Sequence, residues 1–328
     1  MHGTEKPATR EQEESAVRFA ADIRGALSRT PRQLPSRYFY DPLGSALFDA
    51  ICELPWYHIT RAESRLLIEH RSQLLRLLEP LSTIIELGPG SGEKLKRLLE
   101  GPRRGMPLDV HLVDVSARAL EVAAHTLDSL SGVRIATHAA DYADGLSRAS
   151  VLRRGSRNDG RTLVLFLGSN IGNFDPPVAA DFLRGIREHL SAGDALLLGT
   201  DLVKPEADLL LAYDDPLGVT AAFNRNLLVR INRELDADVD LNAFVHRAVW
   251  NAGESRIEMH LEARTTQHVQ IRAAAFELTI SAGERIWTES SYKDEPRDVV
   301  LMLEAAGFGV TEQWIDAPGG FALTLAAS

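Results

Sequence analysis

The sequence of 328 residues contains a single cysteine, Cys52, which excludes an internal disulfide and any zinc site built on several cysteines. No apolar run approaches the roughly 18 residues that a membrane-spanning helix needs. The charged opening segment has no apolar core, so we expect no signal peptide. The ten histidines form no HExxH motif and no helical i, i+4 pair, and we therefore predict no metal site. Together these absences favour a cytoplasmic protein with Cys52 as a core thiol.

Positive charge is also scarce. Lysine and arginine number 36 against 46 aspartates and glutamates, which gives a net charge of −10. A sequence-independent nucleic-acid binder needs a basic face to neutralise phosphates, so the balance argues against that class. Apolar residues make up 45% and charged residues 25%, the usual composition of a globular protein with a large core. The length predicts one large domain or two ordinary ones.

From about residue 83, short apolar runs alternate with helical patterns, which is typical of a parallel sheet covered by helices on both faces. The predicted strands are 83–88, 109–115, 133–141, 162–169 and 194–202. Helical patterns lie between them at 93–100, 116–129 and 177–190. After a helix in 296–308, residues 310–315 and 321–327 read as two closing strands. The fold class is therefore α/β.

Two segments do not follow this alternation. Residues 34–67 are crowded with aromatic rings, which we interpret as a helical cap whose rings fill a core. Residues 209–235 are helical and amphipathic, and 247–293 alternate like antiparallel strands joined by turns. We therefore predict a doubly wound sheet domain over 62–203 and 293–328, a second α+β domain over 14–61 and 204–292, and a flexible segment over 1–13.

The strongest local motif is the glycine-rich stretch IIELGPGSGEK, where a strand runs into Gly88, Gly90 and Gly92 and a helix follows. Glycines let a backbone turn tightly and lie against a ligand. The GxGxG spacing, with Glu86 before it, differs from the GxGxxG of a dinucleotide site and from a P-loop. A plain tight turn remains the alternative interpretation.

The next strands also end in polar groups, at Asp114, at Asp141 followed by Tyr142, and in GSNIGN over 168–173. Parallel strands of an open sheet bind ligands at this carboxyl edge, and an acid at the second strand can accept ribose hydroxyls. The combined pattern resembles the class I S-adenosylmethionine-dependent methyltransferases. That resemblance implies a Rossmann-like sheet of seven strands whose last hairpin is antiparallel, with S-adenosylmethionine as methyl donor and no metal.

A narrower resemblance covers the chain from about residue 15 to its end. The segments that carry it include FLGSNIGNF, AYDDPLGVTAAFNRN, RIEMHLEARTTQHV and TESSYK, together with residues 34–64. They are similar to the histidine Nα-methyltransferases of ergothioneine biosynthesis. Those enzymes use three S-adenosylmethionine molecules to convert L-histidine into the betaine hercynine, and they generally act as monomers. The resemblance implies L-histidine as the substrate, a monomer, and neither nucleic acid nor membrane as partner.

The resemblance also assigns residues. It implies that S-adenosylmethionine is held by Gly88, Lys94, Asp114, Asp141 and Tyr142. It implies that the amino acid is bound by Tyr57, Asn173 and Tyr213, with Tyr40 beside its amine, and that Glu289 and Ser291 bind the imidazole. No residue is assigned as a catalytic base.

The chemistry of these residues supports the assignment, because amide and phenol groups both donate and accept and so suit a zwitterion. Glu289 and Ser291 lie on one face of a predicted strand, where side chains alternate with period two. Structural alternatives stay open. Glu289 would then be a solvated strand acid, Tyr213 a helix-start ring, Asn173 a turn residue and Lys94 a solvated first-turn lysine.

Two other functions also remain open at this stage. A relative of the same family could methylate another amino acid, such as tryptophan, keeping the zwitterion contacts but using a different side-chain pocket. The presence of both Glu289 and Ser291 counts against that alternative. A non-catalytic S-adenosylmethionine-binding or scaffolding protein is the other, and the intact glycine loop, ribose acid and substrate motifs argue against it.

Overall fold

The computed structural model describes residues 10–100, 107–155 and 160–328, and residues 1–9 of the segment predicted to be flexible lie outside this range. The chain divides into two compact units. Unit 1 contains the described residues up to 56 together with 206–251 and 257–289. Unit 2 contains 57–205, 252–256 and 290–328. Each unit is described by itself below.

Unit 2 is built on a seven-stranded sheet of order β11-β12-β5-β4-β1-β2-β3. The strands are β1 Leu81–Leu87, β2 Leu108–Asp114, β3 Val133–Ala139, β4 Arg161–Phe166, β5 Ala195–Asp201, β11 Gly309–Asp316 and β12 Phe321–Ala327. Within this sheet, the neighbouring strands β5, β4, β1, β2 and β3 are parallel to one another, whereas β12 is antiparallel to both β5 and β11. The predicted α/β fold with an antiparallel last hairpin is confirmed.

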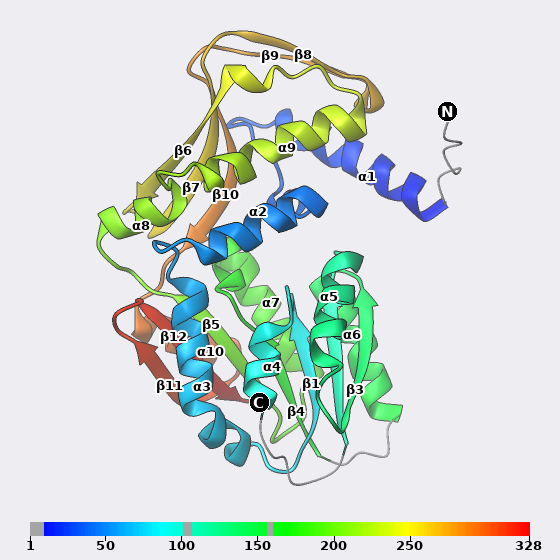
Figure 1. Cartoon of the computed structure of the whole chain (residues 1–328), viewed down its shortest axis with the longest axis vertical. Coiled ribbons are helices and arrows are strands. Elements are labelled where there is room, and N and C mark those ends of the chain that lie inside the picture. The colour runs from blue at the N-terminus through cyan, green and yellow to red at the C-terminus, as the bar shows by residue number, and fades with distance from the viewer. Residues whose placement is uncertain (1–9, 101–106, 156–159) are drawn as a thin grey trace. The chain divides into compact units, whose positions relative to one another are not determined.

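Helices cover both faces of this sheet (Figure 1). The helices of unit 2 are α3 Ile59–Leu77, α4 Glu93–Leu99, α5 Ala117–Leu127, α6 Tyr142–Gly155, α7 Pro176–His189 and α10 Pro296–Ala305. Helices α3, α4 and α5 pack together in one layer, and α7 contacts both α6 and α10 in the other. Strands β1, β4 and β5 are buried on both faces, and each contains a run of apolar residues, such as LVLF in β4 and ALLL in β5.

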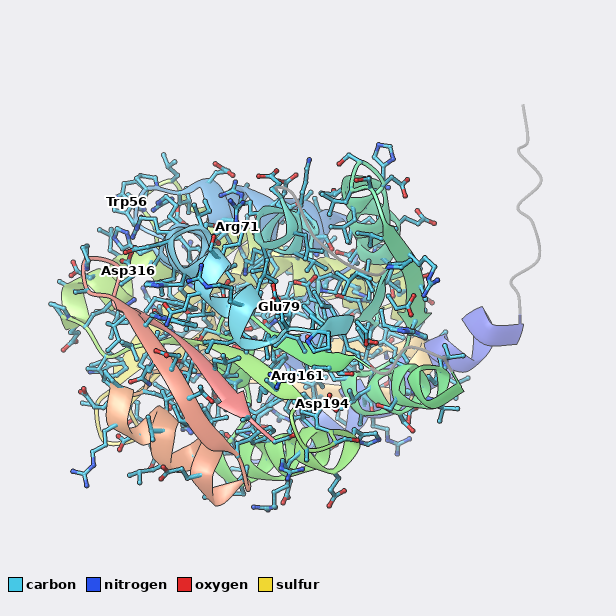
Figure 2. The ribbon with its side chains drawn as sticks, turned by 90° about the horizontal axis from the view of Figure 1, so that it is seen from below. Trp56, Arg71, Glu79, Arg161, Asp194 and Asp316 are labelled. Carbon is cyan, nitrogen blue, oxygen red and sulfur yellow. The ribbon has the colours of Figure 1, made fainter. Side chains whose placement is uncertain are left out.

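The core on the second face joins strand residues to the apolar stripes of α6, α7 and α10. It includes Phe166 from β4, Leu183 from α7 and Leu303 from α10, all fully buried. Figure 2 looks toward the edge at which the strands begin, where Glu79, Arg161 and Asp194 are labelled. There Asp194 accepts a hydrogen bond from the Thr162 backbone N–H at 2.7 Å, which joins the starts of β4 and β5.

Unit 1 combines helices with two small sheets. Its elements are α1 Arg10–Leu27, α2 Pro42–Glu53, α8 Glu206–Tyr213, α9 Val219–Leu235, β6 Phe244–Asn251, β8 Gln267–Ile271 and β9 Phe276–Ile280, with most of β7 Arg256–Ala263 and β10 Arg285–Tyr292. The sheets are β10-β7-β6 and the hairpin β8-β9. Helix α2 begins at Pro42 and is capped by Asp41, whose side chain accepts from the Gly44 N–H at 2.7 Å.

In two stretches of unit 1, a single periodic pattern in the sequence corresponds to two separate elements in the structure. The helical pattern of 209–235 is two helices, because Pro216 interrupts it and Asp215 accepts from the backbone N–H of Thr220 to start α9. The strand pattern of 268–280 is the β8-β9 hairpin, turned at Ala275 with φ of 45°. None of the described helices is long and apolar enough to cross a membrane.

Candidate functional site

The glycine-rich loop follows β1 and leads into α4, as the motif predicts. Gly88, Gly90 and Gly92 all have positive φ, at 73°, 55° and 76°. A Cβ on Gly92 would lie 2.9 Å from the Cα of Ala123, so this glycine lets the loop pack against α5. A Cβ on Gly90 would have no atom within 4 Å. The loop therefore turns through conformations that side chains disfavour and leaves bare backbone at the edge of the sheet.

The carboxyl ends of the next two strands place acids beside this loop. Asp114 ends β2 and accepts from the Ser116 N–H at 2.8 Å, and burial raises the pKa of its carboxyl. Asp141 follows β3 and accepts from the Asp144 N–H at 2.9 Å, which caps α6. Burial, with the Asp114 charge as a smaller cause, raises the pKa of the Tyr142 phenol.

Tyr142 connects these acids to the loop. A Cβ on Gly88 would lie 3.0 Å from the Tyr142 Oη and 3.1 Å from the Asn170 Nδ2, so both groups face the glycine. The ring itself packs edge-on against Phe166 with centroids 5.3 Å apart. Four of the residues assigned to the cofactor, Gly88, Asp114, Asp141 and Tyr142, therefore follow one another at one edge of the sheet of unit 2.

Lys94, the fifth of these residues, is held by a buried acid that the sequence analysis missed. Glu63 of α3 has no exposed surface, and its Oε2 lies 2.5 Å from the Lys94 Nζ. Its Oε1 accepts from the Gly168 N–H at 2.8 Å, just after β4. A Cβ on Gly199 of β5 would lie 2.1 Å from the same oxygen, so a side chain there would displace the Glu63 carboxylate. The alternative of a freely solvated Lys94 is therefore not what the structure shows.

Glu86, the acid before the glycine loop, is buried in the same region. It is 1% exposed, and its Oε2 has no hydrogen-bond partner among the residues that the structure describes. Burial raises the pKa of the Glu86 carboxyl to about 8, with nearby Lys94 acting in the opposite direction and Glu63 adding to the rise. An uncompensated buried carboxyl of this kind is typical of a functional site.

Asn173 ends the short helical turn η2 Asn170–Asn173 after β4, and two contacts fix this turn within unit 2. Ser169, with φ of 58°, accepts from the Asp201 N–H at 2.9 Å. A Cβ on Gly172 would lie 2.8 Å from the backbone oxygen of Tyr292, so the turn packs directly on the end of β10. Asn173 and Ser291 are therefore carried by segments that touch each other.

Ser291 is buried next to two charged residues that the sequence analysis also missed. The Lys293 Nζ donates to the Ser291 Oγ at 2.8 Å and lies 2.8 Å from the Asp201 Oδ2. The other carboxylate oxygen of Asp201 pairs with the Lys204 Nζ at 2.5 Å. The period-two pattern that joins Glu289 to Ser291 would have continued to Lys293, so a signal for this residue was present.

In unit 1, Tyr213 ends α8 and is buried, and its carbonyl oxygen accepts from the His246 Nε2 at 2.8 Å. The Asn224 Nδ2 bonds the other ring nitrogen at 2.8 Å. This pairing fixes the neutral tautomer of His246 that carries hydrogen on Nε2, because an amide N–H can only donate and a carbonyl can only accept. Burial lowers the pKa of His246, which is consistent with a neutral ring.

The remaining assigned residues are Tyr40, Glu289 and Tyr57. The Tyr40 ring packs edge-on against Phe223 in unit 1, with centroids 5.8 Å apart. Glu289 is half-buried, and its backbone oxygen accepts from the Trp287 Nε1 at 2.9 Å. Tyr57 belongs to unit 2 and is buried. The described residues contain no group of three or more metal-ligating side chains.

The sheet order, the glycine loop after the first strand and the acids after the next two define unit 2 as a class I methyltransferase fold. Comparison with known proteins narrows the class. The sequence model of the family described as histidine-specific, S-adenosylmethionine-dependent methyltransferases matches residues 19–328, and the chain belongs to that family.

Named relatives agree with this family. Histidine N-alpha-methyltransferase of Mycolicibacterium smegmatis is 43% identical over 314 residues, covering 95% of each chain. The protein of the same name from Mycobacterium tuberculosis is 43% identical over 312 residues, covering 93% of this chain and 94% of its own. Ergothioneine biosynthesis protein 1 of Neurospora crassa is 32% identical over 203 residues, or 62% of this chain and 23% of its own.

Proposed function

We propose that this protein catalyses the S-adenosylmethionine-dependent Nα-trimethylation of L-histidine to hercynine, the first step of ergothioneine biosynthesis. The observation that carries the proposal is the 43% identity to a histidine N-alpha-methyltransferase over 95% of both chains, which spans the glycine loop and the segments assigned to the amino acid. A cytoplasmic location, which the composition favours, and a monomeric state, which the resemblance implies, remain predictions.

The residues at the carboxyl edge of unit 2 fit S-adenosylmethionine. The glycine backbone gives close access, and Asp114 can accept ribose hydroxyls. The buried Glu86 carboxyl, whose Oε2 has no hydrogen-bond partner in the described part of the chain, suits a ligand that carries positive charge. Lys94 offers an ammonium to a carboxylate. The cofactor supplies an activated methyl group, and this chain must bind it and present an acceptor.

The amino acid would be bound through its zwitterion and its side chain. We propose that Asn173, Tyr57 and Tyr213 hold the amino and carboxylate groups, with Tyr40 beside the amine. Glu289 and Ser291 would bind the two ring nitrogens. The buried Met259, whose carbonyl accepts from the Thr288 hydroxyl at 2.9 Å, contributes an apolar contact to the ring.

For methyl transfer, the protein must position the substrate amine and keep it in its neutral form. The amine must be neutral to attack, so hydrogen bonds from Asn173 and Tyr40 that favour the neutral amine would assist each transfer. Every methylation removes one N–H donor, so the later intermediates depend on the carboxylate and imidazole contacts. This makes the reaction strongly dependent on Glu289. No residue is assigned as the group that accepts the proton lost before each transfer.

The test is mass spectrometry of the purified protein incubated with S-adenosylmethionine and an equimolar mixture of the twenty amino acids. We expect a gain of three methyl groups on histidine alone, with Glu289→Ala greatly raising the KM for histidine. Trimethylation of tryptophan or another amino acid would refute the histidine assignment and keep the cofactor site. Cofactor binding without methylation of any amino acid would refute the proposed activity.

A further inference from the structure

Lys293 is a buried ammonium next to the residue assigned to the imidazole. Its side chain has no exposed surface. Its backbone is fixed on both sides, since the Lys293 N–H donates to the Ser255 carbonyl at 2.8 Å and the Lys293 carbonyl accepts from the Ser255 hydroxyl at 2.7 Å. A charge held this rigidly in the interior constrains the groups it touches.

The constraint on Ser291 follows from the chemistry of an ammonium. Lysine has three N–H donors and no acceptor, so in the 2.8 Å contact the Ser291 oxygen must accept. The hydroxyl hydrogen of Ser291 then points away from Lys293 and must be donated to another acceptor. Accepting from a cation also polarises the hydroxyl and makes it a stronger donor.

Carboxyl groups lie close to the Lys293 side chain. The Asp201 carboxylate lies 2.8 Å from its Nζ. Lys204 pairs with the same carboxylate, and Asp294 is the next residue along the chain. Burial raises the pKa of Asp294 to about 6, with Lys293 lowering it and the carboxylates of Asp298 and Asp201 adding to the rise. The Lys293 and Lys204 side chains therefore belong to one cluster with the carboxyl groups of Asp201 and Asp294.

We propose that Lys293 is a positioning residue that makes Ser291 a hydrogen-bond donor and so selects the neutral imidazole ring of histidine in one tautomer. The inference rests on the proposed function, in which Glu289 and Ser291 bind the two ring nitrogens. Glu289 accepts from the nitrogen that carries hydrogen, and Ser291 donates to the bare nitrogen. Without Lys293, the Glu289 carboxylate would favour an imidazolium, which would use Ser291 as an acceptor.

The effect is one of specificity. If the bound ring were an imidazolium, it would donate to the Ser291 oxygen that already accepts from Lys293. Two positive charges would then lie close together in a buried site. A ring with one donor and one acceptor satisfies both Glu289 and Ser291. An indole, which has one N–H donor and no acceptor nitrogen, would offer no acceptor to the Ser291 hydroxyl, and such a mismatch in a buried site weakens binding strongly.

Nuclear magnetic resonance of ring-¹⁵N-labelled histidine tests the protonation state directly in the wild-type protein. The ligand is bound with S-adenosylhomocysteine at pH 6, where free imidazole, with an ordinary pKa of about 6.5, is mostly protonated. We expect one protonated and one bare ring nitrogen in the bound ligand. Two protonated ring nitrogens would overturn the inference. Lys293→Met, which keeps the length and removes the charge, should convert the bound ring to imidazolium.

Kinetics supply the matched control. Lys293→Met should raise the KM for histidine at pH 8 at least tenfold with a smaller change in kcat, whereas Lys204→Met should change the KM less than about threefold. Lys204 pairs with the same Asp201 but lies outside the Ser291 contact. In a Ser291→Ala background, Lys293→Met should have little further effect on KM, because its action passes through Ser291. Additive effects would show a merely structural role and overturn the inference.

These outcomes separate the inference from the proposed function. If the wild-type protein methylates histidine and binds it as imidazolium, only the role of Lys293 is wrong. If the wild-type protein neither binds nor methylates histidine, the proposed function is wrong and the inference fails with it. Should Lys293→Met fail to fold, the wild-type resonance measurement still decides the protonation state.

Discussion

Replacing Glu86 with glutamine should stabilise the protein at neutral and alkaline pH and change little at pH 4.5. Glu86 is 1% exposed, and burial raises the pKa of its carboxyl from 4.5 to about 8. Below pH 4.5 the carboxyl is protonated in both the folded and the unfolded chain. Between pH 4.5 and 8 the unfolded chain releases this proton while the folded chain keeps it. The free energy of unfolding contributed by Glu86 therefore falls as pH rises.

The size of the effect follows from the two pKa values. Each pH unit between them costs about 1.4 kcal/mol, so the penalty at pH 7 is on the order of 3 kcal/mol. It stops growing near pH 8, where the folded protein also loses the proton. Glutamine has nearly the same shape and does not titrate, so Glu86→Gln should remove the whole pH-dependent term.

Urea unfolding at pH 4.5, 7 and 8.5, followed by circular dichroism, measures this term. The difference in unfolding free energy between Glu86→Gln and the wild type should increase from pH 4.5 to pH 8.5. Glu93→Gln is the matched control, because Glu93 is exposed in the first turn of α4. Parallel pH curves for Glu86→Gln and the wild type would show that the folded protein does not hold this proton, and the reasoning would be refuted.

Three further changes test the two units. Glu63→Gln keeps an acceptor for the Gly168 backbone N–H but removes the charge that holds Lys94. The affinity for S-adenosylmethionine, measured by calorimetry, should therefore fall roughly tenfold, which is equivalent to about 1.4 kcal/mol. An unchanged affinity would contradict the assignment of Lys94. Gly92→Ala combines positive φ with a clash against α5 and should lower the thermal midpoint by several degrees in calorimetric scans; an unchanged midpoint would contradict it. His246→Phe removes the donor to the Tyr213 carbonyl and should raise the KM for histidine more than it lowers kcat. Steady-state kinetics that show a selective loss of kcat would count against a role of His246 in positioning Tyr213.

Hydrophobic patterning was sufficient to predict the sheet of unit 2, because strands buried on both faces carry runs of apolar residues that alternate with helical patterns. The predicted strand 83–88 corresponds to β1 Leu81–Leu87, and 194–202 to β5 Ala195–Asp201. Periodicity failed where a break depends on one residue. Ala275 adopts a left-handed turn between β8 and β9 that no glycine announces, and a run of alanines gives no turn signal.

Of the buried charges in the site, Glu63 is one that sequence reasoning could not find. Glu63 lies in a helix whose pattern is amphipathic, and an acid there is expected on the solvated face. Its burial depends on Lys94 and on Gly199, which are distant in sequence. The roles assigned to the substrate residues came from resemblance, and they remain predictions that the kinetic tests address.

The contacts around Asp201 also bear on how the chain is assembled. The Asp294 N–H donates to the Asp201 carbonyl at 3.1 Å, and the Val203 N–H donates to the Asp294 carbonyl at 3.1 Å. The excursion over residues 206–289 therefore leaves and returns at one point of the sheet. Closing a loop of that length costs roughly 4 kcal/mol of chain entropy, and a folded sheet has already met this cost. Because both ends of this segment are fixed by contacts within unit 2, the entropy of closing it depends on its length and not on its sequence.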